Sequence, residues 1–180
     1  ERCDLEGGLS LEPLRAPHDD RGTTAFLVEF AVDDGVVRLG YATDLGRVPE
    51  GWHERFRDLD ILALESNYDP PMQLSSDRPR FLKERIMGGR GHLSNEQSLA
   101  AALRISRASE LQAVVLLHLS RQCNCPRLVE RLWRERAPHL AERLVVSGQF
   151  QPTPTIRAKT RPRRPGPVER SLFDALSSQL

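Results

Sequence analysis

Several features that define other classes of protein are scarce in this sequence of 180 residues. Only three cysteines occur, Cys3, Cys123 and Cys125, and the close pair is spaced C-x-C with no second pair. Disulfide frameworks need more cysteines, and structural zinc sites combine two pairs of ligands with short spacing. We therefore expect neither a disulfide-stabilised fold nor a zinc knuckle.

Long hydrophobic runs are absent as well. No run of apolar residues approaches the roughly 18–20 residues that a helix needs to cross a bilayer. The first residues, Glu-Arg-Cys-Asp, do not show the pattern of a signal peptide. These observations predict a cytoplasmic protein without a membrane segment.

Neither sign of charge is in excess. The 26 basic and 25 acidic residues give a formal net charge of +1 at pH 7. Such a balance produces no general attraction to polyanions, so any affinity for nucleic acid has to come from local basic clusters. Charge balance alone neither indicates nor excludes a nuclease.

The length and composition predict one folded domain followed by a tail. A hydrophobic fraction of 39% and a charged fraction of 28% are typical of a soluble domain. After about residue 150 the sequence becomes rich in proline, threonine and arginine, and such a segment buries too little apolar area to offset the entropy cost of ordering. We predict a domain over residues 1–150 and a basic, proline-rich, largely disordered tail over residues 151–180.

Strand-like and helix-like segments alternate along the predicted domain, which is the pattern of an α/β fold. Strands are expected at residues 25–32, 36–41, 61–64 and 113–117, and helices at residues 80–86, 95–106 and 126–136. The Asp-Asp-Gly turn at residues 33–35 predicts that the first two strands are antiparallel. Ser94 and Gln97 fit a capping box, which places a helix start shortly after His92.

Ionisable side chains follow three of the predicted strands. Asp44, Glu65 and His118 each stand where an apolar run ends, and carboxyl ends of strands form the ligand crevice in open α/β sheets. His18 precedes the first strand of the hairpin, and His92 precedes a helix. Imidazole and carboxylate groups together suit zinc, manganese or iron, so the residues fit a hydrolytic metal site.

Each of these residues also has a structural interpretation. Asp44 stands before Leu-Gly and fits a turn, His118 fits a hydrogen-bonded core histidine, and His92 fits a loop residue beside a helix cap. Glu65 fits less easily, because a carboxylate that follows a fully apolar strand needs a partner or an exposed position. Spacing alone leaves both interpretations open, since no two of these residues form a short chelating motif.

Taken together, five segments resemble the metallo-β-lactamase-fold exonucleases of the YycJ/WalJ type and, more distantly, ribonuclease Z. The segments are His-Asp at residues 18–19, Ala-Thr-Asp-Leu-Gly at 42–46, Leu-Glu-Ser-Asn-Tyr-Asp at 64–69, Gly-His-Leu-Ser-Asn-Glu at 91–96 and Leu-His-Leu-Ser at 117–120. The resemblance covers residues 8–150 and implies an α/β fold, the metallo-β-lactamase αββα sandwich.

The resemblance also implies roles for individual residues. It makes His18, Asp44 and His118 metal ligands, with Asp44 bridging two divalent ions, either zinc or manganese. His92 corresponds to the histidine that contacts the scissile phosphate or protonates the leaving group. Glu65 matches the acidic residue that orients this histidine in ribonuclease Z-like relatives.

One departure from the family pattern is large. The H-x-H-x-D-H motif, which supplies most of the metal ligands in that family, does not occur in the 180 residues. We therefore expect the chain to be the C-terminal portion of the sandwich, with the N-terminal half absent. This half would leave a large apolar surface uncovered.

The expected function is that of a metal-dependent phosphodiesterase or nuclease, and the resemblance suggests single-stranded DNA, degraded from the 5′ end, as the substrate. Candidate substrate contacts are Arg85, Arg90 and Arg121, together with Asn95. Two alternatives remain: a hydrolase of the same fold that acts on a small ester, thioester, lactam or cyclic phosphodiester, and an inactive truncated module that binds a partner.

The tail contains one further motif. Leu172, Phe173 and Leu176 share one face of a short helical turn, the pattern of a peptide that docks in an apolar groove. The Ser-Leu-Phe sequence resembles peptides that bind the replicative sliding clamp, although Glu169 stands where glutamine is usual. The alternative interpretation is that this turn packs on its own domain or frays.

Overall fold

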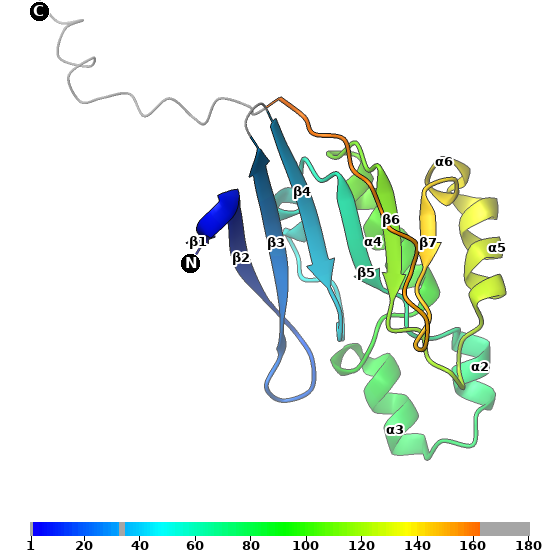
Figure 1. Ribbon diagram of the computed structural model, residues 1–180. Coiled ribbons are helices and arrows are strands. Elements are labelled where there is room, and N and C mark those ends of the chain that lie inside the picture. Colours follow the sequence, from blue (N-terminus) through cyan, green and yellow to red (C-terminus); the bar gives the residue numbers. More distant parts are fainter. Residues whose placement is uncertain (1, 33–34, 163–180) are drawn as a thin grey trace, which may run out of the picture.

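The computed structural model describes residues 2–32 and 35–162, and its centre is a mixed sheet of seven strands (Figure 1). The strands follow one another in space in their sequence order. They are β1 (Cys3–Leu5), β2 (Leu9–Ala16), β3 (Thr23–Val32), β4 (Gly35–Ala42), β5 (Ile61–Glu65), β6 (Ala113–Leu117) and β7 (Leu144–Val146). Strands β1 to β4 pair antiparallel, and β4 to β7 pair parallel.

The helices connect the parallel strands. They are α1 (Trp52–Arg55), α2 (Pro70–Ser75), α3 (Arg80–Arg85), α4 (Asn95–Ser106), α5 (Pro126–Arg136) and α6 (Pro138–Ala141), with short η1 (Glu6–Gly8) and η2 (Ile86–Arg90) turns. Among the described residues, no helix is both long and apolar enough to span a bilayer.

The predicted elements are confirmed, with small shifts at their ends. Helices α4 and α5 begin and end where the sequence predicted, and Ser94 and Gln97 form the capping box. Strands β3 and β4 form the predicted antiparallel hairpin, although the turn residues 33–34 lie outside the described residues. Three strands, β1, β2 and β7, were not predicted.

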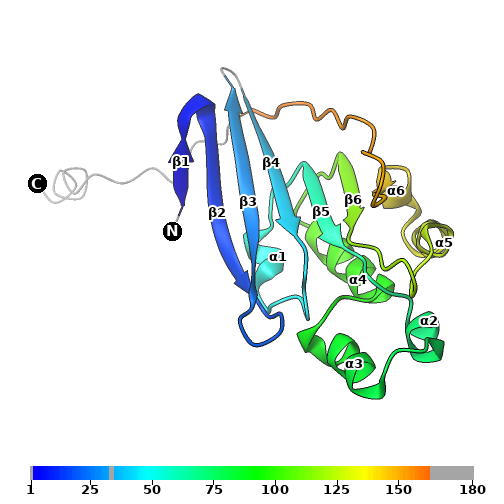
Figure 2. The same ribbon diagram turned by 60° about the horizontal axis from the view of Figure 1, so that its bottom comes forward.

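Helices α1 and α4 cover one face of the sheet, behind β3 to β6 in Figure 1, and they stay on that side in Figure 2. The main core lies between this face and the helices. Its fully buried side chains include Leu62, Leu64, Leu99, Leu116 and Trp133.

The opposite face of β1 to β4 is apolar and open. Pairing places Phe26 beside Tyr41 and Phe30 beside Val37 on this face. Phe30 is 44% exposed and Tyr41 is 37% exposed, so no other part of the described chain covers them. One sheet with helices on a single face corresponds to one half of an αββα sandwich, and the apolar surface expected from the sequence is present.

Part of the segment that we predicted as a tail packs on the sheet. Residues 147–162 run from β7 past the starts of β6 and β5 to the start of β4 (Figure 1). There, the backbone of Arg161 exchanges hydrogen bonds of 2.9 and 3.0 Å with Val36, and the backbone of Lys159 exchanges two with the Gln112 side chain. Residues 163–180, including the proposed clamp motif, lie outside the described residues.

Candidate metal centre

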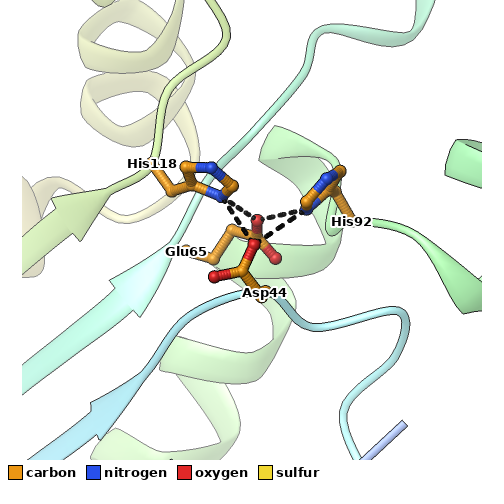
Figure 3. Close-up of side chains that lie close together, drawn as sticks. All are labelled: Asp44, Glu65, His92 and His118. Atoms are coloured by element: carbon orange, nitrogen blue, oxygen red, sulfur yellow. Dashed lines mark hydrogen bonds and ion pairs between the residues drawn. The ribbon is translucent and has the colours of Figure 1, made fainter. Parts of the chain in front are cut away.

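The parallel strands bring the predicted strand-end residues together. Asp44 lies two residues beyond β4, Glu65 is the last residue of β5, and His118 follows β6 directly. Because β4, β5 and β6 are parallel neighbours, these three positions meet at the same edge of the sheet. His92 joins them from the loop between η2 and α4 (Figure 3).

One potential ligand atom from each of Asp44, Glu65, His92 and His118 lies within 4.8 Å of the others. The Nδ1 atoms of His92 and His118 are 2.7 and 2.8 Å from Oε1 of Glu65 (Figure 3). The same nitrogens are 3.9 and 3.4 Å from Oδ1 of Asp44. Two imidazoles and two carboxylates in this arrangement are suitable ligands for a divalent transition metal. We call these four residues the metal group.

Glu65 is the buried centre of the metal group, with no exposed surface. Its Oε2 atom accepts hydrogen bonds from the backbone N–H groups of Leu45, at 2.7 Å, and Leu93, at 3.3 Å. Burial alone raises the pKa of the Glu65 carboxyl, but hydrogen bonds with His118 and His92 outweigh it, and the pKa is lowered. The carboxylate is therefore charged at neutral pH, and the predicted contact between Glu65 and His92 is present.

His118 and Asp44 share an unusual backbone conformation. Their φ angles are 57° and 56°, in the left-handed region that costs a non-glycine residue about 1 kcal/mol. The hydrogen bond with Glu65 raises the pKa of His118, against the smaller opposing effect of burial. Strained backbone at both residues is typical of a site where side-chain direction is fixed by function.

His18 lies beside the metal group rather than within it. Its ring centroid is 5.2 Å from that of His92, and its Nδ1 atom is 2.8 Å from the carbonyl oxygen of Gly91. Backbone hydrogen bonds from Gly46 to Pro17 and from Asp19 to Arg90 join the surrounding loops. The sequence grouped His18 with Asp44 and His118, whereas the structure groups His92 and Glu65 with them. A ligand role for His18 remains a prediction.

Two of the predicted substrate residues face the metal group. Arg85 and Arg121 line a pocket of about 560 Å³ together with His92 and His118. Arg90 lines a neighbouring pocket with His18 and forms an ion pair with Asp20. Arg85 also lines this second pocket, so it lies between the two, whereas Arg121 lines the first and Arg90 the second.

Asn95, which we predicted from the sequence as a substrate contact, points into the protein in this structure. Asn95 is only 2% exposed, and its side chain forms hydrogen bonds of 2.8 to 3.0 Å with Ser66 and Asn124. As the first residue of α4 it turns inward, where its amide links the start of the helix to the loops after β5 and β6. Its proximity to His92 in sequence did not indicate this direction.

Sequence reasoning also missed residues near the metal group. Arg78 lines the same pocket as His92 and His118 and donates hydrogen bonds to Gln73, Ser120 and Gln122. Its partners Ser120 and Gln122 lie more than forty residues away in the sequence, so no local pattern identifies this position.

A mixed sheet with helices on one face, and imidazole and carboxylate side chains gathered at the carboxyl ends of its parallel strands, agrees with one half of the metallo-β-lactamase fold. The chain belongs to the β-lactamase superfamily domain family, whose model matches residues 1–119. The resemblance seen in the sequence is thus confirmed at the level of the family and fold.

Similar proteins include a nuclease. The chain is 29% identical over 122 residues to the exodeoxyribonuclease WalJ of Streptococcus pneumoniae strain D39, which covers 68% of the chain and 44% of WalJ. The chain thus spans less than half the length of this curated relative.

Solved structures support the fold at low sequence identity. The metallo-β-lactamase fold protein YhfI of Bacillus subtilis aligns with a TM-score of 0.57 and 13% identity, over 82% of this chain and 49% of YhfI. The short form of human tRNase Z aligns with a TM-score of 0.50 and 16% identity, over 83% of this chain and 42% of that protein.

Proposed function

We propose that this chain carries part of the active site of a metal-dependent phosphodiesterase that cleaves nucleic acid. The observation that supports it most is the metal group at the carboxyl ends of β4, β5 and β6, where a buried carboxylate holds two histidines beside Asp44. The similarity to an exodeoxyribonuclease favours DNA as the substrate, and the preference for a single strand stays a prediction. Cleavage from the 5′ end and a cytoplasmic location stay predictions.

The donor set of the metal group fits the divalent ions that the fold family uses. Asp44 and His118 would hold them, with His18 alongside, and Asp44 is the candidate bridge because carboxylates can bind two ions at once. Bound zinc or manganese ions would supply an activated water and polarise the phosphate. Asp44 is 39% exposed at its side chain, which leaves it open to ions and substrate.

His92 is proposed as the general acid that protonates the leaving oxygen. Its Nδ1 is bonded to Glu65, so its Nε2 is the nitrogen left for a substrate in the adjoining pocket. The contact with Glu65 also fixes the orientation of the imidazole ring. Glu65 is a positioning residue, because it holds His92 and His118 in place without exposed surface of its own.

Further metal ligands are needed for a complete two-ion site. The sequence contains no H-x-H motif. We propose that a segment outside these 180 residues, in the same chain or in another, supplies the remaining ligands against the open face of the sheet. The alternatives are a hydrolase of small esters or cyclic phosphodiesters with the same fold, and an inactive binding module.

The substitution His92→Ala tests the division of roles, in a preparation of the protein whose metal site is complete. We expect turnover of a labelled single-stranded oligodeoxynucleotide to fall by roughly 10²–10⁴-fold, the usual contribution of a general acid. Metal content, measured by elemental analysis, should stay near that of the unchanged protein. Loss of metal would make His92 a ligand, and unchanged turnover would exclude it as the acid.

The same preparation separates the alternatives. A nuclease cleaves the oligonucleotide and leaves small carboxylic esters intact, whereas a small-ester hydrolase shows the reverse preference. An inactive module cleaves neither and holds well under one ion per chain.

A further inference from the structure

Arg78 is held in place by uncharged partners. Its guanidinium donates hydrogen bonds to Gln73 Oε1 and Ser120 Oγ, both at 3.3 Å, and to Gln122 Oε1 at 3.4 Å. Gln73 is fully buried, and its Nε2 atom has no hydrogen-bond partner within the described residues. The buried amide of Gln73 therefore contacts Arg78 through its oxygen, and that oxygen is held in place by the surrounding core.

The positive charge of Arg78 has no carboxylate counterpart in the part of the chain that the structure describes. Within residues 2–32 and 35–162 no carboxylate forms an ion pair with Arg78, and that includes the adjacent Asp77. Arg85 and Arg90 differ, since they lie against Asp19, at 3.6 Å, and Asp20. An arginine fixed by neutral acceptors keeps its full attraction for an anion.

Arg121 is a second cation at the same pocket without a carboxylate partner in the described part of the chain. Its guanidinium carbon lies 5.1 Å from the ring centroid of Phe150, which is a cation–π contact. Among the described residues, its guanidinium N–H groups have no hydrogen-bond acceptor. Arg78 and Arg121 therefore present two cations in one pocket that no described carboxylate pairs with.

This pocket is coupled to the metal group by short connections. His92 and His118 line it together with both arginines. Ser120, which accepts from Arg78, lies two residues after His118, and its backbone N–H donates to Asn67. Asn67 in turn donates from its side chain to the His118 carbonyl oxygen at 2.7 Å. Arg78 is thus fixed relative to His118 through two residues.

We propose that Arg78 and Arg121 form a second phosphate site, which binds the phosphate next to the one that is cleaved. The inference rests on the proposed function and refines its substrate class. A substrate that uses this site must carry at least two successive phosphates. A polynucleotide meets this requirement, and a small single phosphodiester does not. Binding at this site requires no metal.

The test is binding of a fluorescently labelled single-stranded oligodeoxynucleotide to the chain in EDTA, followed by anisotropy. Arg78→Gln should weaken binding by about tenfold, the effect of one charge-assisted contact. It should also make the slope of log K against log salt shallower by about 0.7, as expected when one phosphate contact is lost from a single strand. Arg134→Gln on α5 removes an equal charge from an exposed position and should change neither quantity.

Arg78→Lys provides a second variant that keeps the charge. It should retain the salt slope and lose only part of the affinity, because lysine lacks the planar fork of donors. Equal binding by Arg78→Gln and Arg134→Gln would overturn the proposal, as would an unchanged salt slope in Arg78→Gln. Since the assay contains no metal, failure of the proposed metal chemistry would leave its result unaffected.

Discussion

Glu65 is the residue whose ionisation ties the metal group to folding. Its lowered pKa means that the folded state favours the carboxylate, so this stabilisation is fully present above the ordinary carboxyl pKa and is lost as the pH falls through the lowered folded value. The ion pairs of Glu65 with His118 and with His92 are then lost. The pH range concerned lies below about 4.5.

Glu65→Gln should therefore destabilise the metal-free chain in a pH-dependent way. We expect the free energy of unfolding to fall by about 2–3 kcal/mol at pH 7, the contribution of hydrogen bonds to a buried charge. The difference from the unchanged chain should narrow below about pH 4.5. Urea denaturation in EDTA, repeated from pH 7 to below pH 4.5, measures the free energy of unfolding of both proteins. The substitution Glu135→Gln at an exposed position is the control. A difference that is constant with pH would contradict the assigned ionisation.

Gly46 shows how closely the loops around the metal group approach one another. A Cβ atom at this position would lie 2.4 Å from the carbonyl oxygen of Gly89 and 2.8 Å from the Cα of Arg90. Both contacts are with backbone, which cannot move aside as a flexible side chain can. The loop that carries Asp44 therefore requires glycine here.

Gly46→Ala should push the Asp44 loop away from the loop before His92. We expect a loss of about 1–3 kcal/mol in stability, typical of overpacking, and weaker metal binding. Thermal unfolding and metal titration measure the two effects. Gly88→Ala is the matched control, since a Cβ there meets no atom within 4 Å. Similar behaviour of both variants would show that the close approach is not required.

At the scale of elements, the sequence predicted a strand or helix correctly where its local pattern agrees with the tertiary packing. β5 and β6 are continuous apolar runs buried on both faces, and the capping box marks the start of α4, so each was predictable. β2 contains Pro13 and alternates in character, and β7 has only three residues. These two strands exist because they pair with neighbours, which a single segment cannot reveal.

The site follows the same rule. The convergence of Asp44, Glu65 and His118 was predictable because strand ends are recognisable and parallel strands align them. Arg78 was not singled out because two of its hydrogen-bond partners, Ser120 and Gln122, come from a different loop. The inward direction of Asn95 was not predicted because the direction of a side chain at a helix start depends on what packs against it.

The backbone pairing of Arg161 with Val36, near the C-terminal end of the described chain, is supported by a buried charge. Asp60, which has no exposed surface, is 2.7 Å from the Nε atom of Arg161 in an ion pair and also accepts from the backbone of Arg38 and the side chain of Gln112. The ion pair between Asp60 and Arg161 explains why residues 151–162, which have the composition of a tail, lie against the sheet. Composition alone did not contain this information.

Arg161→Ala should release this segment and leave Asp60 without its cation. We expect a loss of about 3 kcal/mol in unfolding free energy, because removing one partner of a buried pair leaves an uncompensated charge. Limited proteolysis should show faster cleavage between residues 147 and 162. Arg157→Ala, at an exposed position in the same segment, serves as the control, and equal cleavage rates in the two variants would contradict the anchoring role of Arg161.

At the scale of the whole molecule, the chain combines a formed metal group with an open apolar face. The helices cover one side of the sheet, whereas Phe30, Val32 and Tyr41 remain exposed on the other. The family match and the shared fold agree with the α/β organisation that the sequence predicted. The sequence contains no H-x-H motif. The proposed two-ion site therefore needs additional ligands from outside these residues.

The central claim is that the metal group binds a divalent ion, and equilibrium dialysis of the chain against zinc tests it directly. Asp44→Asn should reduce zinc affinity by at least about tenfold while the fold, followed by circular dichroism, is kept. Glu130→Gln, an equal loss of charge at an exposed position on α5, should bind zinc as the unchanged chain does. Equal affinity in the Asp44→Asn variant and the unchanged chain would contradict the metal-site account.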